Sequence, residues 1–137
     1  MSFLLDTCVL SESTKAEPND GVVRWLAQTP DNLKYVSVLS LAEVKFGILC
    51  SPSGQRRTRL EHWYENVLRP SASDRVLPMD EVAALKWAEI KAQYRNAPVL
   101  DAQIAATALA HGLTLVTRNI RDFAFAGLAV FNPWQAR

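Results

Sequence analysis

The stretch Phe3-Leu4-Leu5-Asp6-Thr7-Cys8-Val9-Leu10 joins a short apolar run to an acid, a hydroxyl and a thiol, almost at the start of the chain. A short apolar run that stops at a polar residue is typical of a buried strand. We therefore expect a central strand at residues 3–5, with Asp6 at its carboxyl end. Asp6 is also well suited to cap a helix over residues 7–11. Whether Asp6 caps a helix or takes part in catalysis depends on which residues the rest of the chain brings close to it.

Apolar runs bounded by turn residues predict further strands at residues 35–38, 75–78, 113–116 and 128–131. Apolar residues at helical spacing predict helices at roughly 20–28, 40–50, 55–68, 80–95 and 101–111. This alternation favours an α/β fold with a central, mainly parallel five-stranded sheet flanked by helices. We expect strand 3–5 in the middle and strand 128–131 at an edge. Helices 40–50 and 55–68 follow each other without a strand, as do 80–95 and 101–111, so one helix of each pair could form an arm or interface.

Length and composition fit a single domain over residues 1–137, with 49% hydrophobic and 21% charged residues. The net charge of +1 gives no general attraction for nucleic acid, which would need a local basic patch. Cys8 and Cys50 are far apart in the sequence, which favours a reducing compartment over a disulfide or a zinc site. The chain has neither a run of about 18 apolar residues nor a signal peptide. We expect a cytoplasmic protein that does not enter membranes.

Acidic residues lie close to the predicted strand ends. Asp6 follows the first strand, Glu43 lies in the helix after the second, Asp101 opens the helix before the fourth, and Asp122 follows the fourth. The carboxyl ends of parallel strands share one edge of a sheet, so these acids can converge there. Two carboxylates about 4 Å apart would repel each other by about 4 kcal/mol at an effective dielectric near 20, unless a cation lies between them. Oxygen ligands without His or Cys favour Mg²⁺ or Mn²⁺, and the implied chemistry is phosphodiester hydrolysis.

Each acid also has a purely structural explanation. Ser40-Leu41-Ala42-Glu43 has the form of a capping box, and Asp101 is well placed as the N-cap of an Ala-rich helix. Asp122 suits an Asx turn. Asp80 precedes the helix predicted at 80–95, and we interpret it as an N-cap rather than a fifth ligand. Capping and catalysis are compatible, so these explanations do not exclude a metal site.

Four segments together match a known pattern. They are Leu4-Leu5-Asp6-Thr7, Ser40-Leu41-Ala42-Glu43-Val44-Lys45-Phe46-Gly47, Leu100-Asp101-Ala102-Gln103-Ile104-Ala105-Ala106-Thr107-Ala108 and Thr117-Arg118-Asn119-Ile120-Arg121-Asp122-Phe123. They resemble the PIN-domain ribonucleases, specifically the VapC toxins of VapBC toxin–antitoxin modules and the FitB-like branch, over essentially the whole chain. The resemblance implies a PIN-like three-layer fold and a Mg²⁺- or Mn²⁺-dependent endoribonuclease toxin. It also implies a homodimer and a cognate VapB-type antitoxin. The chain would then contact DNA only indirectly, through the antitoxin.

The resemblance also assigns roles to individual residues. The metal ligands correspond to Asp6, Glu43, Asp101 and Asp122, and Thr117 matches a Ser or Thr that positions the acids or a water. Further residues that could support the ligands or contact substrate are Thr7, Cys8, Asn119, Arg118 and Arg121.

Two features of the chain depart from the family pattern, Cys8 and the loop at residues 94–99, and Asn119 differs from the residue in many relatives. Cys8 stands where this branch commonly carries Asn, and a thiol would orient Asp6 only weakly. Asn119 falls where many relatives carry another Asp. The loop at residues 94–99 is shorter than the Gly-bearing loop usual before the late helix, which would alter the entrance to the site.

Two other functions compete with the nuclease. One is a non-catalytic PIN-like module that binds RNA or a protein, favoured by Cys8 and the short loop. The other is a phosphoaspartyl phosphatase, because such enzymes present a nucleophilic Asp at the end of an apolar strand. Those enzymes need a second acid two residues further on, where this chain has Cys8. No feature indicates which RNA a nuclease of this kind would cut.

Overall fold

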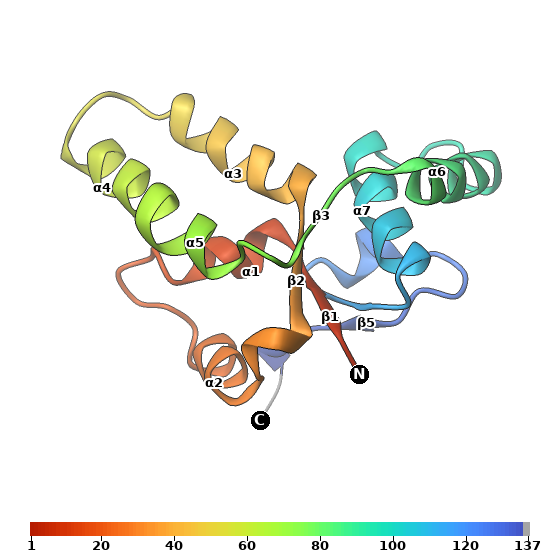
Figure 1. Cartoon of the computed structure of the whole chain (residues 1–137), viewed down its shortest axis with the longest axis horizontal. Helices are drawn as coiled ribbons and strands as arrows, with labels where there is room; N and C mark the ends of the chain where they lie inside the picture. The colour runs from red at the N-terminus through yellow and green to blue at the C-terminus, as the bar shows by residue number, and fades with distance from the viewer. Residues whose placement is uncertain (136–137) are drawn as a thin grey trace.

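A parallel sheet of five strands forms the centre of the molecule (Figure 1). A computed structural model describes residues 1–135. The strands are short: β1 Phe3–Leu5, β2 Lys34–Ser37, β3 Val76–Leu77, β4 Thr114–Val116 and β5 Val130–Phe131. Their order is β3-β2-β1-β4-β5, and every pair of neighbours is parallel. The central place of β1 and the edge place of β5 confirm the prediction from the sequence.

Helices cover both faces of this sheet. They are α1 Thr7–Glu12, α2 Asp20–Gln28, α3 Val38–Leu49, α4 Gln55–Trp63, α5 Arg69–Ser71, α6 Glu81–Gln93 and α7 Val99–Ala110. A π-helical segment, η2 Tyr64–Leu68, joins α4 to α5, and short 3₁₀ turns occur at η1 Asp31–Leu33, η3 Ile120–Phe123 and η4 Pro133–Gln135. No helix within residues 1–135 is long and apolar enough to cross a membrane.

Alternation along β1 and β4 divides the core into two layers. Leu4 and Leu115 pack with Ile104 and other residues of α6 and α7. Leu5 and Val116, the next residue on each strand, face the opposite layer with Val9 of α1 and with α2, α3 and η2. Successive side chains of a strand point to opposite faces, so a sheet covered on both sides needs a continuous apolar run. This explains why Phe3-Leu4-Leu5 carries no polar residue.

Two helices begin earlier than the sequence patterns predicted. α3 begins at Val38 with Ser37 as N-cap, because the Ser37 hydroxyl at the end of β2 accepts the Leu39 N–H at 3.0 Å. The predicted capping box at Ser40 is therefore wrong, and Ser40 is fully buried inside the helix. α7 begins at Val99 after Pro98, whose fixed φ suits a helix start, so Asp101 is the third residue of the helix and not its cap.

The remaining capping predictions have mixed outcomes. Asp6 caps α1 and Asp80 caps α6, where its carboxylate accepts the Ala83 N–H at 2.9 Å. Asp122 lies within the 3₁₀ turn η3, where its backbone N–H donates to the Asn119 carbonyl.

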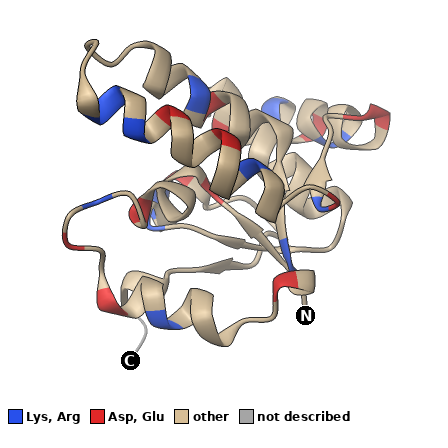
Figure 2. Ribbon diagram, turned by 60° about the vertical axis from the view of Figure 1, so that its left-hand side comes forward, with Lys and Arg blue, Asp and Glu red and all other residues tan. Residues whose placement is uncertain are grey.

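The helix predicted at 55–68 is α-helical only as far as Trp63 and continues as the π-helical segment η2. The surface charges are interspersed, in keeping with the small net charge (Figure 2).

Candidate active site

Asp6 is held at the carboxyl ends of the central strand β1 and its neighbour β4. It lies where β1 ends and α1 begins, and it is only 6% exposed. One carboxylate oxygen, Oδ1, accepts the Thr7 N–H at 2.8 Å. The other, Oδ2, accepts the hydroxyl of Thr117 at 2.7 Å. Because Thr117 directly follows β4 and is fully buried, the pairing of β1 with β4 fixes the direction in which Asp6 points.

Cys8 completes this buried group but contributes the weakest contacts. Its sulfur lies 3.8 Å from Asp6 Oδ2 and 3.6 Å from Thr117 Oγ1. Burial raises the pKa of the Cys8 thiol, so the group is neutral at pH 7. Cys8 also packs against the apolar layer that contains Val9, as a small hydrophobic residue would. The main support of Asp6 is therefore Thr117 and the Thr7 backbone, and the thiol contacts Asp6 only weakly, as expected from the sequence.

Glu43 and Thr7 form a second link. Glu43 lies on α3 and is half-buried, and the Thr7 hydroxyl donates a hydrogen bond to its Oε1. Thr7 thus supports two acids, Asp6 through its backbone and Glu43 through its side chain. Asn119 acts from the other side with its backbone N–H, which donates to Thr117 Oγ1 at 3.1 Å. Its side chain is exposed.

Asp101 lies in the negative field of the other three predicted acids. It is half-buried on α7, and its pKa is raised to about 6. The largest cause is burial, followed by the negative charges of Asp122, Asp6 and Glu43 in that order. Each predicted acid therefore acts on Asp101 electrostatically, although the four are far apart in the sequence. Asp122 itself is exposed on η3.

The donor set can be compared with the needs of a divalent cation. Within residues 1–135, no three His, Cys, Asp or Glu side chains are arranged as a ready metal site. The chemistry of the acids nevertheless fits a hard cation, because all four offer carboxylate oxygens, and the charges of the other three add to the effect of burial in raising the pKa of Asp101. Asp6, Glu43, Asp101 and Asp122 are the residues that could hold such an ion. The metal site stays a prediction.

Basic residues lie beside the acids. Arg118 and Arg121 are exposed, and neither takes part in an ion pair within the described residues. The Arg118 guanidinium lies 5.5 Å from the centre of the Trp134 ring, close enough for a cation–π contact. Arg121 lines two polar hollows, and Asp122 lines both as well. Both arginines are thus free to meet an anion that approaches the acids.

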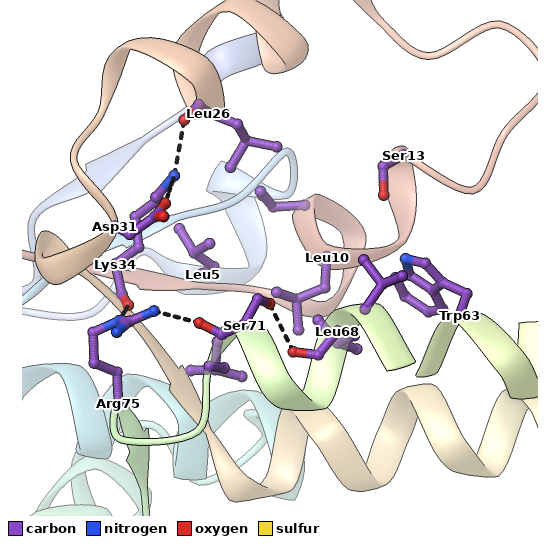
Figure 3. Close-up of a pocket in the computed structure, with 14 residues that line it drawn as sticks. Leu5, Leu10, Ser13, Leu26, Asp31, Lys34, Trp63, Leu68, Ser71 and Arg75 are labelled. Atoms are coloured by element: carbon purple, nitrogen blue, oxygen red, sulfur yellow. Dashed lines mark hydrogen bonds and ion pairs between the residues drawn. The ribbon is translucent and has the colours of Figure 1, made fainter. Parts of the chain in front are cut away.

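A separate apolar pocket lies away from these acids. It has a volume of about 230 Å³ and lies between α1, β2 and the η2–α5 segment. Figure 3 shows Leu10, Leu68 and Trp63 around it. At one end, Arg75 donates to the carbonyl oxygens of Lys34 and Ser71. The sequence reasoning missed this pocket, because the segments that line it are distant in the chain and each alone resembles ordinary core.

Comparison with known proteins gives the family of the chain. The PIN domain model matches residues 3–127. "VapC ribonuclease Y4jK" of Sinorhizobium fredii is 38% identical over 137 residues, which cover 97% of this chain and 98% of that protein. "Toxin FitB" of Neisseria gonorrhoeae is 37% identical over 136 residues, with 96% and 98% covered.

Solved structures agree with these relatives. The crystal structure of FitAcB from Neisseria gonorrhoeae contains a chain that matches with a TM-score of 0.91 and 36% identity, over 97% of this chain and 99% of that one. A structure of FitAB bound to a DNA fragment gives the same TM-score at 35% identity, with 98% and 97% covered. The resemblance inferred from the sequence is therefore confirmed, and the chain belongs to the PIN domain family.

Proposed function

We propose that this chain is the toxin of a type II toxin–antitoxin module and acts in the cytoplasm as a Mg²⁺- or Mn²⁺-dependent endoribonuclease. The relatives named VapC ribonuclease and toxin FitB support the class of activity. The observation that supports a metal site at the acids is the raised pKa of Asp101, which is caused by burial and by three other carboxylates. Such a cluster is destabilising by itself and becomes favourable when a divalent cation is bound.

The residues of the chain have distinct tasks in this proposal. Thr117 and the Thr7 backbone keep Asp6 in one orientation, and the Thr7 hydroxyl does the same for Glu43. Asp101 and Asp122 supply the remaining ligands from α7 and η3. A bound divalent ion supplies activation of water and neutralisation of charge on the phosphodiester. Arg118 and Arg121 would contact phosphate oxygens of the RNA.

The same proposal includes an antitoxin as partner. Solved relatives are complexes named FitAB and FitAcB. The apolar pocket beside Leu10, Trp63 and Leu68 suits an apolar segment of an antitoxin, because the pocket is open and its floor is hydrophobic (Figure 3). DNA would be contacted only through that antitoxin.

A homodimer would cover a different part of the surface. Phe46 and Leu49 of α3 are 67% and 55% exposed, and Val82 and Leu85 of α6 are both 62% exposed. Exposed apolar side chains of this size mark protein interfaces. The mass of the purified chain in solution tests this part of the proposal, and a monomer at high concentration would refute it.

The activity is tested with purified, antitoxin-free protein and a set of structured RNAs in Mg²⁺ or Mn²⁺. We expect cleavage by the wild type and none by Asp6→Asn or Asp101→Asn. Asp20→Asn, an exposed acid at the start of α2, makes the same change in charge and should cleave normally. Cleavage that persists with a chelator or in either site variant would refute the metal–carboxylate mechanism. RNA binding without cleavage would favour the non-catalytic module, and hydrolysis of small phosphate esters would favour the phosphatase.

A further inference from the structure

A polar cleft of about 490 Å³ opens next to Asp122. One wall is the loop between α6 and α7, with Arg95 and Asn96, and the other is η3 with Arg121 and Asp122. A second hollow of about 370 Å³ shares Arg121 and Asp122 with this cleft. Both hollows therefore adjoin the exposed acid of the candidate site. Neither belongs to the apolar pocket of Figure 3, with which they share no lining residue.

Contacts of the loop between α6 and α7 hold the walls of the larger cleft in place. The Lys91 ammonium donates to the carbonyl oxygens of Arg95 and Ala97 at 2.9 and 2.6 Å. The hydroxyl of Tyr94 accepts the Ala126 N–H at 3.1 Å, which ties the end of α6 to the chain after η3. The rings of Tyr94 and Phe125 meet edge to face at 5.1 Å. The cleft is thus preformed, so a ligand would not have to order it.

The charged groups of the cleft are suited to an anion. Arg95 and Arg121 are exposed on opposite walls, and neither forms an ion pair in the part of the chain that the structure describes. Asp122 is the acid in the lining and would repel a phosphate placed beside it unless a cation intervened. Two arginines on opposite walls can bind phosphate oxygens while the acid faces the reacting centre.

We propose that this cleft seats a single strand of RNA beside the scissile phosphate, with Arg95 and Arg121 binding phosphates of that strand from opposite walls. The inference rests on the proposed nuclease function and names its substrate-binding residues. A single strand fits better than a duplex because its bases are free to stack, and the partly exposed ring of Tyr94 lines the cleft. The second hollow, which shares Arg121 and Asp122 with the cleft, offers Arg118 to the continuing strand.

The test measures RNA binding separately from cleavage. The probe is a fluorescein-labelled 20-nucleotide single-stranded RNA of mixed sequence, titrated by anisotropy in Mg²⁺ with protein carrying Asp101→Asn to stop cleavage. We expect Arg95→Ala with Arg121→Ala to weaken binding by about tenfold or more. The pair should also reduce the slope of log K against log salt by about 1.4, because each phosphate contact with a single strand contributes about 0.7. The same RNA annealed to its complement should bind more weakly to the unaltered cleft.

A matched control removes two exposed arginines elsewhere. Arg24 lies on α2 and Arg69 on α5, so Arg24→Ala with Arg69→Ala makes the same change in net charge without touching the cleft. Equal loss of affinity in both double variants would overturn the inference, because it would show attraction by net charge alone. Tighter binding of the duplex would overturn it as well. In the cleaving protein, we expect the Arg95 and Arg121 variants to raise KM with little change in kcat.

Failure of this inference is distinguishable from failure of the nuclease. If the wild type cuts RNA and the Arg95→Ala, Arg121→Ala variant binds and cuts it equally well, the nuclease stands and the cleft is not the substrate seat. If Asp101→Asn cuts as fast as the wild type, the nuclease mechanism fails whatever the cleft binds. Lys91→Met provides a further variant, since it releases the loop that carries Arg95 without removing an arginine. It should weaken binding less than Arg95→Ala does.

Discussion

The two sides of the candidate site are built in opposite ways. On the sheet side, Asp6 and Thr117 are buried, and each makes hydrogen bonds to the other or to the backbone. On the loop side, Asp122, Arg121 and Arg95 are exposed and have no ion-pair partner among the described residues. The sheet therefore fixes the direction of a ligand, while the loops leave charges free for a substrate. Rigid elements carry precise positions, and loops carry contacts that depend on the partner.

The exposed side depends on a buried anchor. Phe123 lies in η3 next to Asp122 and is only 2% exposed. We expect Phe123→Ala to lower the free energy of unfolding by about 3–5 kcal/mol, because it leaves a cavity in the layer beneath η3. Urea unfolding followed by circular dichroism measures this. Ile120→Ala, in the same turn but with the side chain 41% exposed, should cost under about 1 kcal/mol. Equal costs would show that η3 is not held by Phe123.

The buried side depends on one hydroxyl. Thr117→Val keeps the shape of the side chain but removes the donor to Asp6 and the acceptor for the Asn119 N–H. We expect a loss of about 1.5–3 kcal/mol in stability and about 10- to 100-fold in RNA cleavage. Thr107→Val is the matched control, because Thr107 is also fully buried but its hydroxyl donates to the Gln103 carbonyl within α7. A control variant as damaged as Thr117→Val would mean that the effect is one of packing.

Asp101 lies between the two sides, and its pKa of about 6 makes the metal-free fold sensitive to pH. The carboxyl binds a proton more tightly in the folded protein than in the unfolded chain, where its pKa is about 3.9. Its contribution to stability is therefore lost as the pH rises from about 4 to about 6. In EDTA, Asp101→Asn should be more stable than the wild type at pH 8, with a smaller difference at pH 4.5.

Added Mg²⁺ should reverse this order. A cation that binds only the folded state stabilises it, and it should raise the melting temperature of the wild type more than that of Asp101→Asn. Asp20→Asn controls for the change in net charge and should behave as the wild type does in both media. If neither Mg²⁺ nor Mn²⁺ changes the melting temperature of the wild type, a metal site at these acids is contradicted.

The same contrast explains what could be predicted from the sequence. The sheet side follows local rules: Phe3-Leu4-Leu5 must be a buried strand, and an acid at its end must lie at the shared edge of the sheet. The start of α3 could not be settled in this way, because Ser37 and Ser40 are both plausible N-caps. The end of β2 decides for Ser37, and that is a tertiary effect.

The loop side gave little local signal. The sequence predicts that residues 94–99 form a short loop that alters the entrance to the site, but no pattern indicates that Lys91 binds its carbonyl groups or that Tyr94 reaches Ala126. These contacts join segments whose distance depends on the packing of α6, α7 and η3. Arg95 could therefore not be assigned to the site from the sequence, whereas Arg118 and Arg121 could, because they follow β4 within a few residues.

Cys8 gives the smallest expected effect and the sharpest comparison with Thr117. Both contact Asp6 Oδ2, but the sulfur lies 3.8 Å away and the Thr117 hydroxyl 2.7 Å. Because a thiol is a weak donor, Cys8→Ala should lower stability by under about 1 kcal/mol and cleavage by less than about fivefold. Cys8→Asn places there the amide common in this branch of the family, and it should not raise cleavage if Thr117 already orients Asp6. Single-turnover cleavage rates decide this, and a loss in Cys8→Ala equal to that in Thr117→Val would show that the thiol holds the acid.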